Sequence, residues 1–260
     1  MFDICKKIII QKPYFALLTG LADSNRQAMG LQQTSLPYKN LFFPHYYLCN
    51  YLPVSVGQDT LSQSLLRFKR AYQPDLDAWI DCALEILTEA PLLPDTIIIR
   101  ALHHNETIVP QNKPTSLDHL GKALAAHFHF DYYPGLLCKT RPAREIKSLS
   151  REQREIELSG LYYIDDHYRN SLAGHPILIL DDILTTGTTM KMIVSALGNH
   201  PSLRIFTLAK ADYDDSLNKS TPLKGQNYQL QQGMGWQVAE EQSIYYTLSQ
   251  LKARIKANSF

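Results

Sequence analysis

The chain has 260 residues, and its 26 basic and 25 acidic side chains leave a formal net charge of +1. This near balance gives no support to extensive binding of nucleic acid or of an anionic membrane surface, which usually shows as a strong basic excess. The chain is 45% hydrophobic and 20% charged, and it has neither a secretory signal nor an apolar run of the roughly 18 residues that span a membrane, so we expect a globular, cytoplasmic protein.

The first 60 residues predict an irregular extension. Prolines interrupt any long periodic pattern there, at Pro13, Pro37, Pro44 and Pro53. The stretch 41–53 is rich in aromatic residues, which fit packing against the rest of the chain better than a hood that stacks on a bound base. The aromatic side chains concerned are Phe42, Phe43, Tyr46, Tyr47 and Tyr51.

Beyond the extension, apolar patterns typical of helices and of buried strands alternate along the chain. The expected helices lie at 75–87, with Asp75 as the cap, at 117–128 and at 188–197. The expected strands lie at 96–102, 135–140, 160–164, 175–182 and 204–211. This alternation predicts an α/β domain over residues 61–211, with a mainly parallel sheet flanked by helices.

Residues 212–260 predict a C-terminal extension, a polar linker followed by a last helix. The apolar stripe of that helix contains Ile244, Leu248, Leu251 and Ile255. The stripe fits packing within the chain or a contact between the two copies of a homodimer.

The segment 177–189 carries the most chemical information. An apolar strand ends in Asp181 and Asp182, and a loop rich in threonine and glycine then leads into a helix. Ligands of open α/β sheets bind at the carboxyl ends of the strands, and a helix N-terminus favours an anion. Gly187 allows a tight turn close to a phosphate, whereas the carboxylates suit ribose hydroxyls or Mg²⁺. The alternative is an ordinary strand–turn–helix with capping threonines.

The motif is neither a Walker P-loop nor a Rossmann fingerprint. The sequence DDILTTGTT after an apolar strand instead resembles the phosphoribosyl-pyrophosphate (PRPP) motif of type I phosphoribosyltransferases. The resemblance implies that Asp181 and Asp182 are catalytic residues that hold the ribose hydroxyls of PRPP, directly or through Mg²⁺. It also implies that the 5′-phosphate is wrapped by Thr185, Thr186, Gly187, Thr188 and Thr189.

Two features indicate which branch of the family the chain resembles most. Some purine-salvage members carry an Asp where this chain has Thr185, so the chain is closer to the orotate and ComF-like branches. Residues 65–87 are also similar to the segment that precedes the first strand of ComF-type proteins. The paired cysteines of the ComF zinc motif are absent, because only Cys49 lies in that region.

The family's pyrophosphate loop would follow the strand at 97–99. The resemblance therefore implies that Arg100 and Ala101 contact pyrophosphate, and His103 and His104 could donate to the same loop. The alternative for Arg100 is a surface ion pair with Glu106.

The densest basic segment lies at 139–154, where type I enzymes have a flexible loop that closes over PRPP. Its basic residues are Lys139, Arg141, Arg144, Lys147, Arg151 and Arg154. We expect Arg141, Arg144 and Lys147 to reach the leaving pyrophosphate while the loop excludes water. The alternatives are a solvated helix face or, less supported, a contact with nucleic acid.

The resemblance implies an enzyme that binds Mg-PRPP and transfers its phosphoribosyl group to a nitrogen acceptor, with release of pyrophosphate. The sequence contains no nucleobase-binding motif, so the acceptor is not identified. One alternative is a ComF-like protein that senses PRPP or a nucleotide without catalysis and acts in DNA uptake or nucleic-acid metabolism. Another is a site for a different sugar phosphate.

Overall fold

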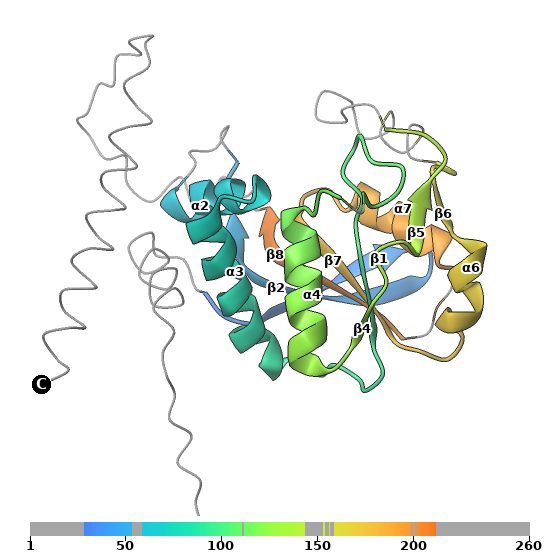
Figure 1. Cartoon of the computed structure of the whole chain (residues 1–260), viewed down its shortest axis with the longest axis horizontal. Helices are drawn as coiled ribbons and strands as arrows, with labels where there is room; N and C mark the ends of the chain where they lie inside the picture. Colours follow the sequence, from blue (N-terminus) through green and yellow to red (C-terminus); the bar gives the residue numbers. More distant parts are fainter. Residues whose placement is uncertain are drawn as a thin grey trace, which may run out of the picture. The chain divides into compact units, whose positions relative to one another are not determined.

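A six-stranded sheet with helices on both faces forms the centre of the computed structural model (Figure 1). The structure describes residues 29–53, 59–110, 112–143, 159–198 and 202–211, together with 153, 156 and 200. All of these residues fall within one compact unit, which takes in residues 1–215. The expected linker and helix at 212–260 lie outside the described residues.

The strand order in the main sheet is β1-β2-β8-β7-β3-β4. These strands are β1 (Gln32–Tyr38), β2 (Leu41–Tyr51), β8 (Leu203–Ala211), β7 (Ile177–Leu184), β3 (Ile97–Arg100) and β4 (Asp131–Tyr132). Only β1 and β2 pair antiparallel, and every other neighbouring pair in this sheet is parallel. The expected α/β class with a mainly parallel sheet is therefore confirmed.

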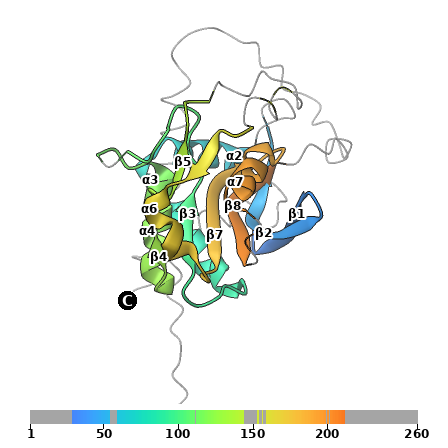
Figure 2. The same cartoon turned by 90° about the vertical axis from the view of Figure 1, so that its right-hand side faces the viewer.

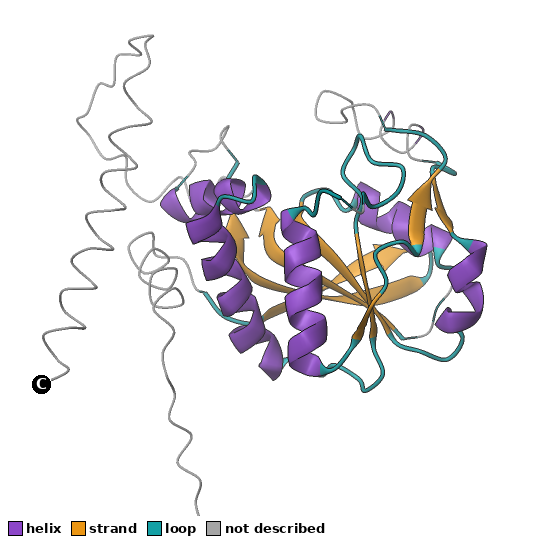
Figure 3. Ribbon diagram, viewed as in Figure 1, coloured by secondary structure: helices purple, strands orange, loops and turns teal. Residues whose placement is uncertain are grey.

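Two apolar clusters cover the two faces of the sheet, because successive residues of a strand point to opposite faces. In β7, Leu178 and Leu180 pack in the first cluster, whereas Ile177 and Ile179 pack in the second. The helices that contribute to the first cluster are α2 (Thr60–Lys69), α3 (Gln73–Ile86) and α4 (Ser116–Phe128). Helix α7 (Thr188–Ala196) covers the other face, as Figures 2 and 3 show. Burial on both faces explains the continuous apolar runs of β3 and β7.

The helices predicted at 75–87, 117–128 and 188–197 are confirmed by α3, α4 and α7. Asp75 is not the cap of α3, because the helix begins earlier, after Tyr72. Asp75 lies in the first turn of α3, and its carboxylate accepts hydrogen bonds from Ser64 and from Nε of Arg67 in α2. The short elements η2 (Leu87–Glu89), α6 (Asp166–Arg169) and η4 (Asn170–Leu172) complete the helices in the described part of the chain.

The strands expected at 135–140 and 160–164 do form, but outside the main sheet. They are β5 (Leu137–Lys139) and β6 (Tyr162–Ile164), which pair antiparallel with each other. An apolar run shows neither which sheet a strand joins nor its direction, so alternation alone did not reveal this separate antiparallel pair.

The expectation of an irregular stretch over residues 1–60 is wrong for residues 32–51, which form β1 and β2. The prolines are tolerated because Pro37 lies in an edge strand and Pro44 precedes His45, where the pairing of β2 with β8 begins. Phe43 and Tyr46 are buried, as expected for packing, while Phe42 is 72% exposed. None of the helices among the described residues has the length and apolar character needed to cross a membrane.

Helix α4 packs against β4 through a glycine, which gives a prediction for stability. A Cβ at position 121 would lie 2.5 Å from Cε2 of Tyr132, whose Oη donates to Asp118 at 2.8 Å. We expect Gly121→Ala to destabilise the protein by about 1–3 kcal/mol through overpacking, although alanine favours a helix by about 0.5–1 kcal/mol over glycine. Urea denaturation measures the change.

The exposed neighbour Lys122 provides the control for this experiment, because Lys122→Ala should change the free energy of unfolding by less than about 0.5 kcal/mol. A Gly121→Ala variant at least as stable as the wild type would contradict the prediction, since the Tyr132 ring would then move aside without cost.

Candidate functional site

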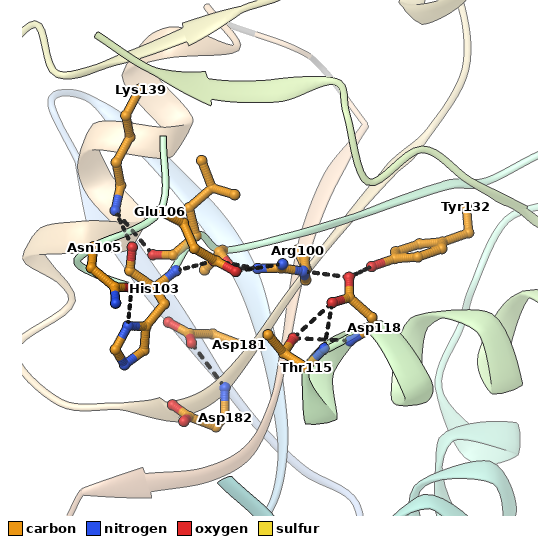
Figure 4. Close-up of polar contacts among 12 residues, drawn as sticks. Arg100, His103, Asn105, Glu106, Thr115, Asp118, Tyr132, Lys139, Asp181 and Asp182 are labelled. Atoms are coloured by element: carbon orange, nitrogen blue, oxygen red, sulfur yellow. Dashed lines mark hydrogen bonds and ion pairs between the residues drawn. The ribbon is translucent and has the colours of Figure 1, made fainter. Parts of the chain in front are cut away.

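The carboxyl end of β3 lies beside β7 just before its two aspartates and brings two predicted segments together. Arg100 pairs with Leu180 in the parallel ladder, and the N–H of Ala101 donates to the Leu180 carbonyl at 2.8 Å. The loop after β3 therefore lies beside Asp181 and Asp182, as Figure 4 shows. This is the edge at which open α/β sheets bind their ligands.

The two aspartates are held by the chain itself. Asp181 Oδ1 accepts from the N–H of Asp182 at 2.9 Å, and Asp182 Oδ1 accepts from the N–H of Ile183 at 2.8 Å. Lys69, the last residue of α2, places its Nζ 2.6 Å from Asp182 Oδ2. Sequence reasoning missed Lys69, although it lies in the segment 65–87 that resembles ComF-type proteins.

Burial and the neighbouring carboxylate of Asp182 raise the pKa of Asp181 to about 7, although Lys69 acts in the opposite direction. Burial alone would lower the pKa of Lys69, but the Asp182 carboxylate raises it. The lysine therefore stays charged at neutral pH, while the ionised form of Asp181 is costly in the free protein.

The predicted phosphate loop joins β7 to α7. Gly187 is the N-cap of α7 with a φ of 73°, and no side chain caps the helix, so the alternative of capping threonines does not hold. A Cβ on Gly187 would lie 2.7 Å from Cδ1 of Leu36, which places β1 directly against the loop. Thr185 and Thr186 are exposed, and the hydroxyls of Thr186 and Thr188 lie 3.0 Å apart. The uncapped N–H groups and these hydroxyls suit an anion.

Arg100 does not reach this site, which corrects the expected pyrophosphate contact. Its side chain is 1% exposed and donates from Nε to Asp118 at 2.6 Å, and from Nη1 and Nη2 to Glu106 at 2.8 and 3.0 Å. The pair with Glu106 is confirmed, but it lies in the interior and not at the surface. Ala101 offers no free N–H either, because its amide donates within the sheet.

The Arg100 cluster also fixes the start of α4. Asp118 accepts from the N–H of Thr115 at 2.7 Å in a capping box and from Tyr132 Oη at 2.8 Å. Burial would raise the pKa of Asp118, but the hydrogen bonds from Arg100 and Thr115 lower it. Burial would likewise raise the pKa of Glu106, and its bonds from Arg100 lower that pKa too. Both carboxylates are therefore ionised at neutral pH.

Lys139 fixes the loop after β3 from the opposite side. Its buried Nζ donates to the carbonyls of His103 at 2.6 Å and Leu102 at 3.2 Å (Figure 4). Glu106 accepts from the N–H of His103 at 2.6 Å. Burial lowers the pKa of Lys139 to about 8. The sequence identified Lys139 only as part of the basic segment, and the structure shows that it binds the backbone carbonyls of the loop.

The predicted lid is described only in part. Arg141 is exposed in the loop after β5, and the N–H of Ala143 donates to the His104 carbonyl at 2.8 Å. Arg144 and Lys147 lie outside the described residues, so their roles stay predictions.

The acidic pair alone does not form a complete metal site. The described residues contain no group of three or more His, Cys, Asp or Glu side chains that could hold a metal ion. Asp181 and Asp182 offer carboxylate oxygens, the ligands that Mg²⁺ prefers, but one of these oxygens already forms an ion pair with Lys69. The pair therefore fits Mg²⁺ as an ion whose other ligands arrive with a phosphate-bearing substrate.

Residues 139–239 match the family model of the phosphoribosyl transferase domain. The matched segment begins at Lys139 and contains the acidic pair with residues 185–189, and it supports a phosphoribosyltransferase. Comparison with curated proteins finds no match.

Solved structures of adenine phosphoribosyltransferases resemble the chain at low sequence identity. The Trypanosoma brucei structure, in complex with AMP, pyrophosphate and ribose-5-phosphate, is 12% identical with a TM-score of 0.37, over 82% of this chain and 99% of that chain. The Leishmania donovani structure is 14% identical with a TM-score of 0.33, over 86% and 92% of the two chains. The Saccharomyces cerevisiae structure is 15% identical with a TM-score of 0.29, over 76% and 88%. Likeness at this level says nothing about the substrate of this chain.

The buried Arg100 cluster gives a second prediction. Arg100→Met leaves the carboxylates of Glu106 and Asp118 buried without their cation, so we expect a loss of about 3–5 kcal/mol in the free energy of unfolding. Arg169→Met removes an exposed ion pair with Asp166 and should cost no more than about 1 kcal/mol. Urea denaturation of both variants decides the point, and equal losses would show that burial adds nothing to the Arg100 pairs.

The raised pKa of Asp181 gives a third prediction. Between its unfolded pKa near 4 and its folded pKa of about 7, the native state binds the extra proton, so wild-type stability falls as pH rises through this range. Asp181→Asn keeps an oxygen that can accept from Asp182 N–H and lacks this titration. We therefore expect the free energy of unfolding of the variant, relative to that of the wild type, to rise from pH 5 to pH 8. Denaturation at both pH values measures the change.

Asp166→Asn is the matched control, because the Asp166 side chain is 88% exposed. A stability difference between Asp181→Asn and the wild type that does not change from pH 5 to pH 8 would contradict the prediction.

Proposed function

We propose that the chain is a phosphoribosyltransferase that binds PRPP and transfers its phosphoribosyl group to a nitrogen acceptor, releasing pyrophosphate. One observation carries the proposal: the Asp181–Asp182 pair in the carboxyl-terminal half of β7 lies a few residues before the uncapped N-terminus of α7, inside the segment that matches the family model. Carboxylates and free amide groups side by side suit a molecule with both sugar hydroxyls and a phosphate.

Each part of PRPP has a matching group at this edge. The 5′-phosphate would accept from the N–H groups and hydroxyls of residues 185–189, while the ribose hydroxyls would donate to Asp181 and Asp182. The diphosphate would lie toward the loop that follows β3, with Arg141 approaching from the loop after β5. Bound Mg²⁺ would neutralise diphosphate charge, with Asp181 and Asp182 as the residues that would hold it.

The reaction needs positioning and charge stabilisation rather than a covalent intermediate. The bond from the anomeric carbon to the diphosphate oxygen breaks and its electron pair leaves with pyrophosphate, while the bond to the acceptor nitrogen forms and that nitrogen gives up its proton to solvent. Positive charge develops on the ribose in the transition state, and the carboxylates of Asp181 and Asp182, once ionised, would stabilise it. The loop that follows β3 is held by hydrogen bonds from Lys139 to the His103 carbonyl and from the His103 N–H to Glu106.

Within the family, Thr185 supports a place near the orotate and ComF-like branches, because the Asp that some purine-salvage members carry there is missing. The acceptor is therefore best sought with a panel of nucleobases and simple amines. The assay follows pyrophosphate release from PRPP in the presence of Mg²⁺.

The decisive prediction concerns the acidic pair. We expect the double variant Asp181→Asn with Asp182→Asn to bind PRPP at least about 100-fold more weakly, because each bond to a charged group contributes about 1.5–3 kcal/mol and 1.4 kcal/mol is tenfold in affinity. Calorimetric titration with PRPP and Mg²⁺ measures the change, with Asp166→Asn as the control of unchanged affinity. Circular dichroism checks that the double variant is folded.

The outcomes separate the candidate functions. Unchanged PRPP affinity in the double variant would refute the assignment of the pair. PRPP binding by the wild type without pyrophosphate release across the panel would instead favour the PRPP-sensing alternative.

A further inference from the structure

Lys69 is a charged residue at the site that lies outside the segment matched by the family model. It comes from the end of α2 and contacts Asp182 with Nζ 2.6 Å from Oδ2, and its own side chain is 45% exposed. The lysine therefore extends from the surface onto a carboxylate that is almost buried.

The backbone around Lys69 is fixed. Phe68 is fully buried, and the turn that ends α2 is closed by bonds from the N–H of Ala71 to the Phe68 carbonyl at 2.8 Å and from the N–H of Tyr72 to the Arg67 carbonyl at 3.1 Å. A basic residue in the last turn of a helix is also favoured by the helix dipole. The fold thus fixes the point on the backbone from which the Lys69 side chain extends to Asp182.

Most of the oxygens of the acidic pair are already used. Three of the four carboxylate oxygens accept from the chain, namely Asp181 Oδ1 and both oxygens of Asp182. Mg²⁺ demands a nearly octahedral set of oxygen ligands, and an ammonium 2.6 Å from one of these oxygens repels a second cation. A sugar hydroxyl meets no such conflict, because it donates to a carboxylate and accepts from one of the remaining N–H groups of the ammonium.

We propose that Lys69 is a positioning residue that keeps Asp182 oriented for ribose hydroxyls and prevents a bare divalent cation from binding at the acidic pair. The inference rests on the proposed function in its ribose part, whereas its metal part does not. A divalent cation then enters this site only together with a phosphate-bearing ligand that supplies its own oxygens. Lys69 thereby sets the ligand preference of the pair.

The experiment uses Lys69→Met, which keeps the length of the apolar stem and removes the charge, and Lys69→Arg, which keeps a cation. Each full-length protein is titrated calorimetrically with MgCl₂ alone and, separately, with ribose 5-phosphate without metal. We expect Lys69→Met to bind Mg²⁺ at least about tenfold more tightly than the wild type and ribose 5-phosphate about tenfold more weakly, since one charge-assisted contact is lost. Lys69→Arg should return both affinities toward the wild-type values.

Two controls make the test specific. Lys122→Met removes an exposed lysine of α4 and should leave both titrations unchanged. In an Asp182→Asn background, Lys69→Met should no longer change the Mg²⁺ affinity, because Asp182→Asn has already removed the ion pair; the two substitutions form a double-mutant cycle.

Unchanged Mg²⁺ affinity in folded Lys69→Met would overturn the inference. Failure of the proposed function has a different signature, in which the wild type binds neither ribose 5-phosphate nor PRPP. In that case tighter Mg²⁺ binding by Lys69→Met would still support the role of Lys69 against bare cations.

Discussion

The buried guanidinium of Arg100 is the interaction on which the ligand-binding edge depends. It joins the end of β3 to the following loop through Glu106 and to the start of α4 through Asp118. A charge removed from water is tolerated only with close partners, so a loop conformation that displaced Glu106 would leave its buried carboxylate without a cation and Arg100 with Asp118 alone. The network therefore fixes one loop conformation beside Asp181, whatever its net contribution to stability.

This stiffness has a functional consequence. Lys139 and Glu106 engage backbone groups of the loop at Leu102 and His103, so these groups are oriented by the chain itself, as the proposed function needs. Groups oriented before the reaction stabilise developing charge without a further cost of ordering. The groups left for a ligand are concentrated at the uncapped start of α7 and at the acidic pair.

The sequence was informative where the determinants are local. The apolar run of β7, its two aspartates and Gly187 lie within about a dozen residues, and the structure places them close together, although β7 continues past the aspartates to Leu184. Arg100 was misassigned because its partner Asp118 is 18 positions away, and no local pattern tells a buried ion pair from a ligand contact. Strands β1 and β2 were missed because a proline interrupts a pattern whether it lies in a loop or at a sheet edge. Lys69 and Asp182 are further apart still, and only the packing of α2 reveals their contact.

The site departs from the regularity of the strand that carries it. Leu180 packs in the first apolar cluster and so does Ile183, whereas Leu184 packs in the second, so the alternation is interrupted where the two aspartates lie. A fold optimised only for stability would place apolar residues at these positions. Lys69 compensates the charge of Asp182, whereas burial and the Asp182 carboxylate raise the pKa of Asp181 to about 7. Such a conflict between local regularity and burial is expected where a ligand supplies the missing partner.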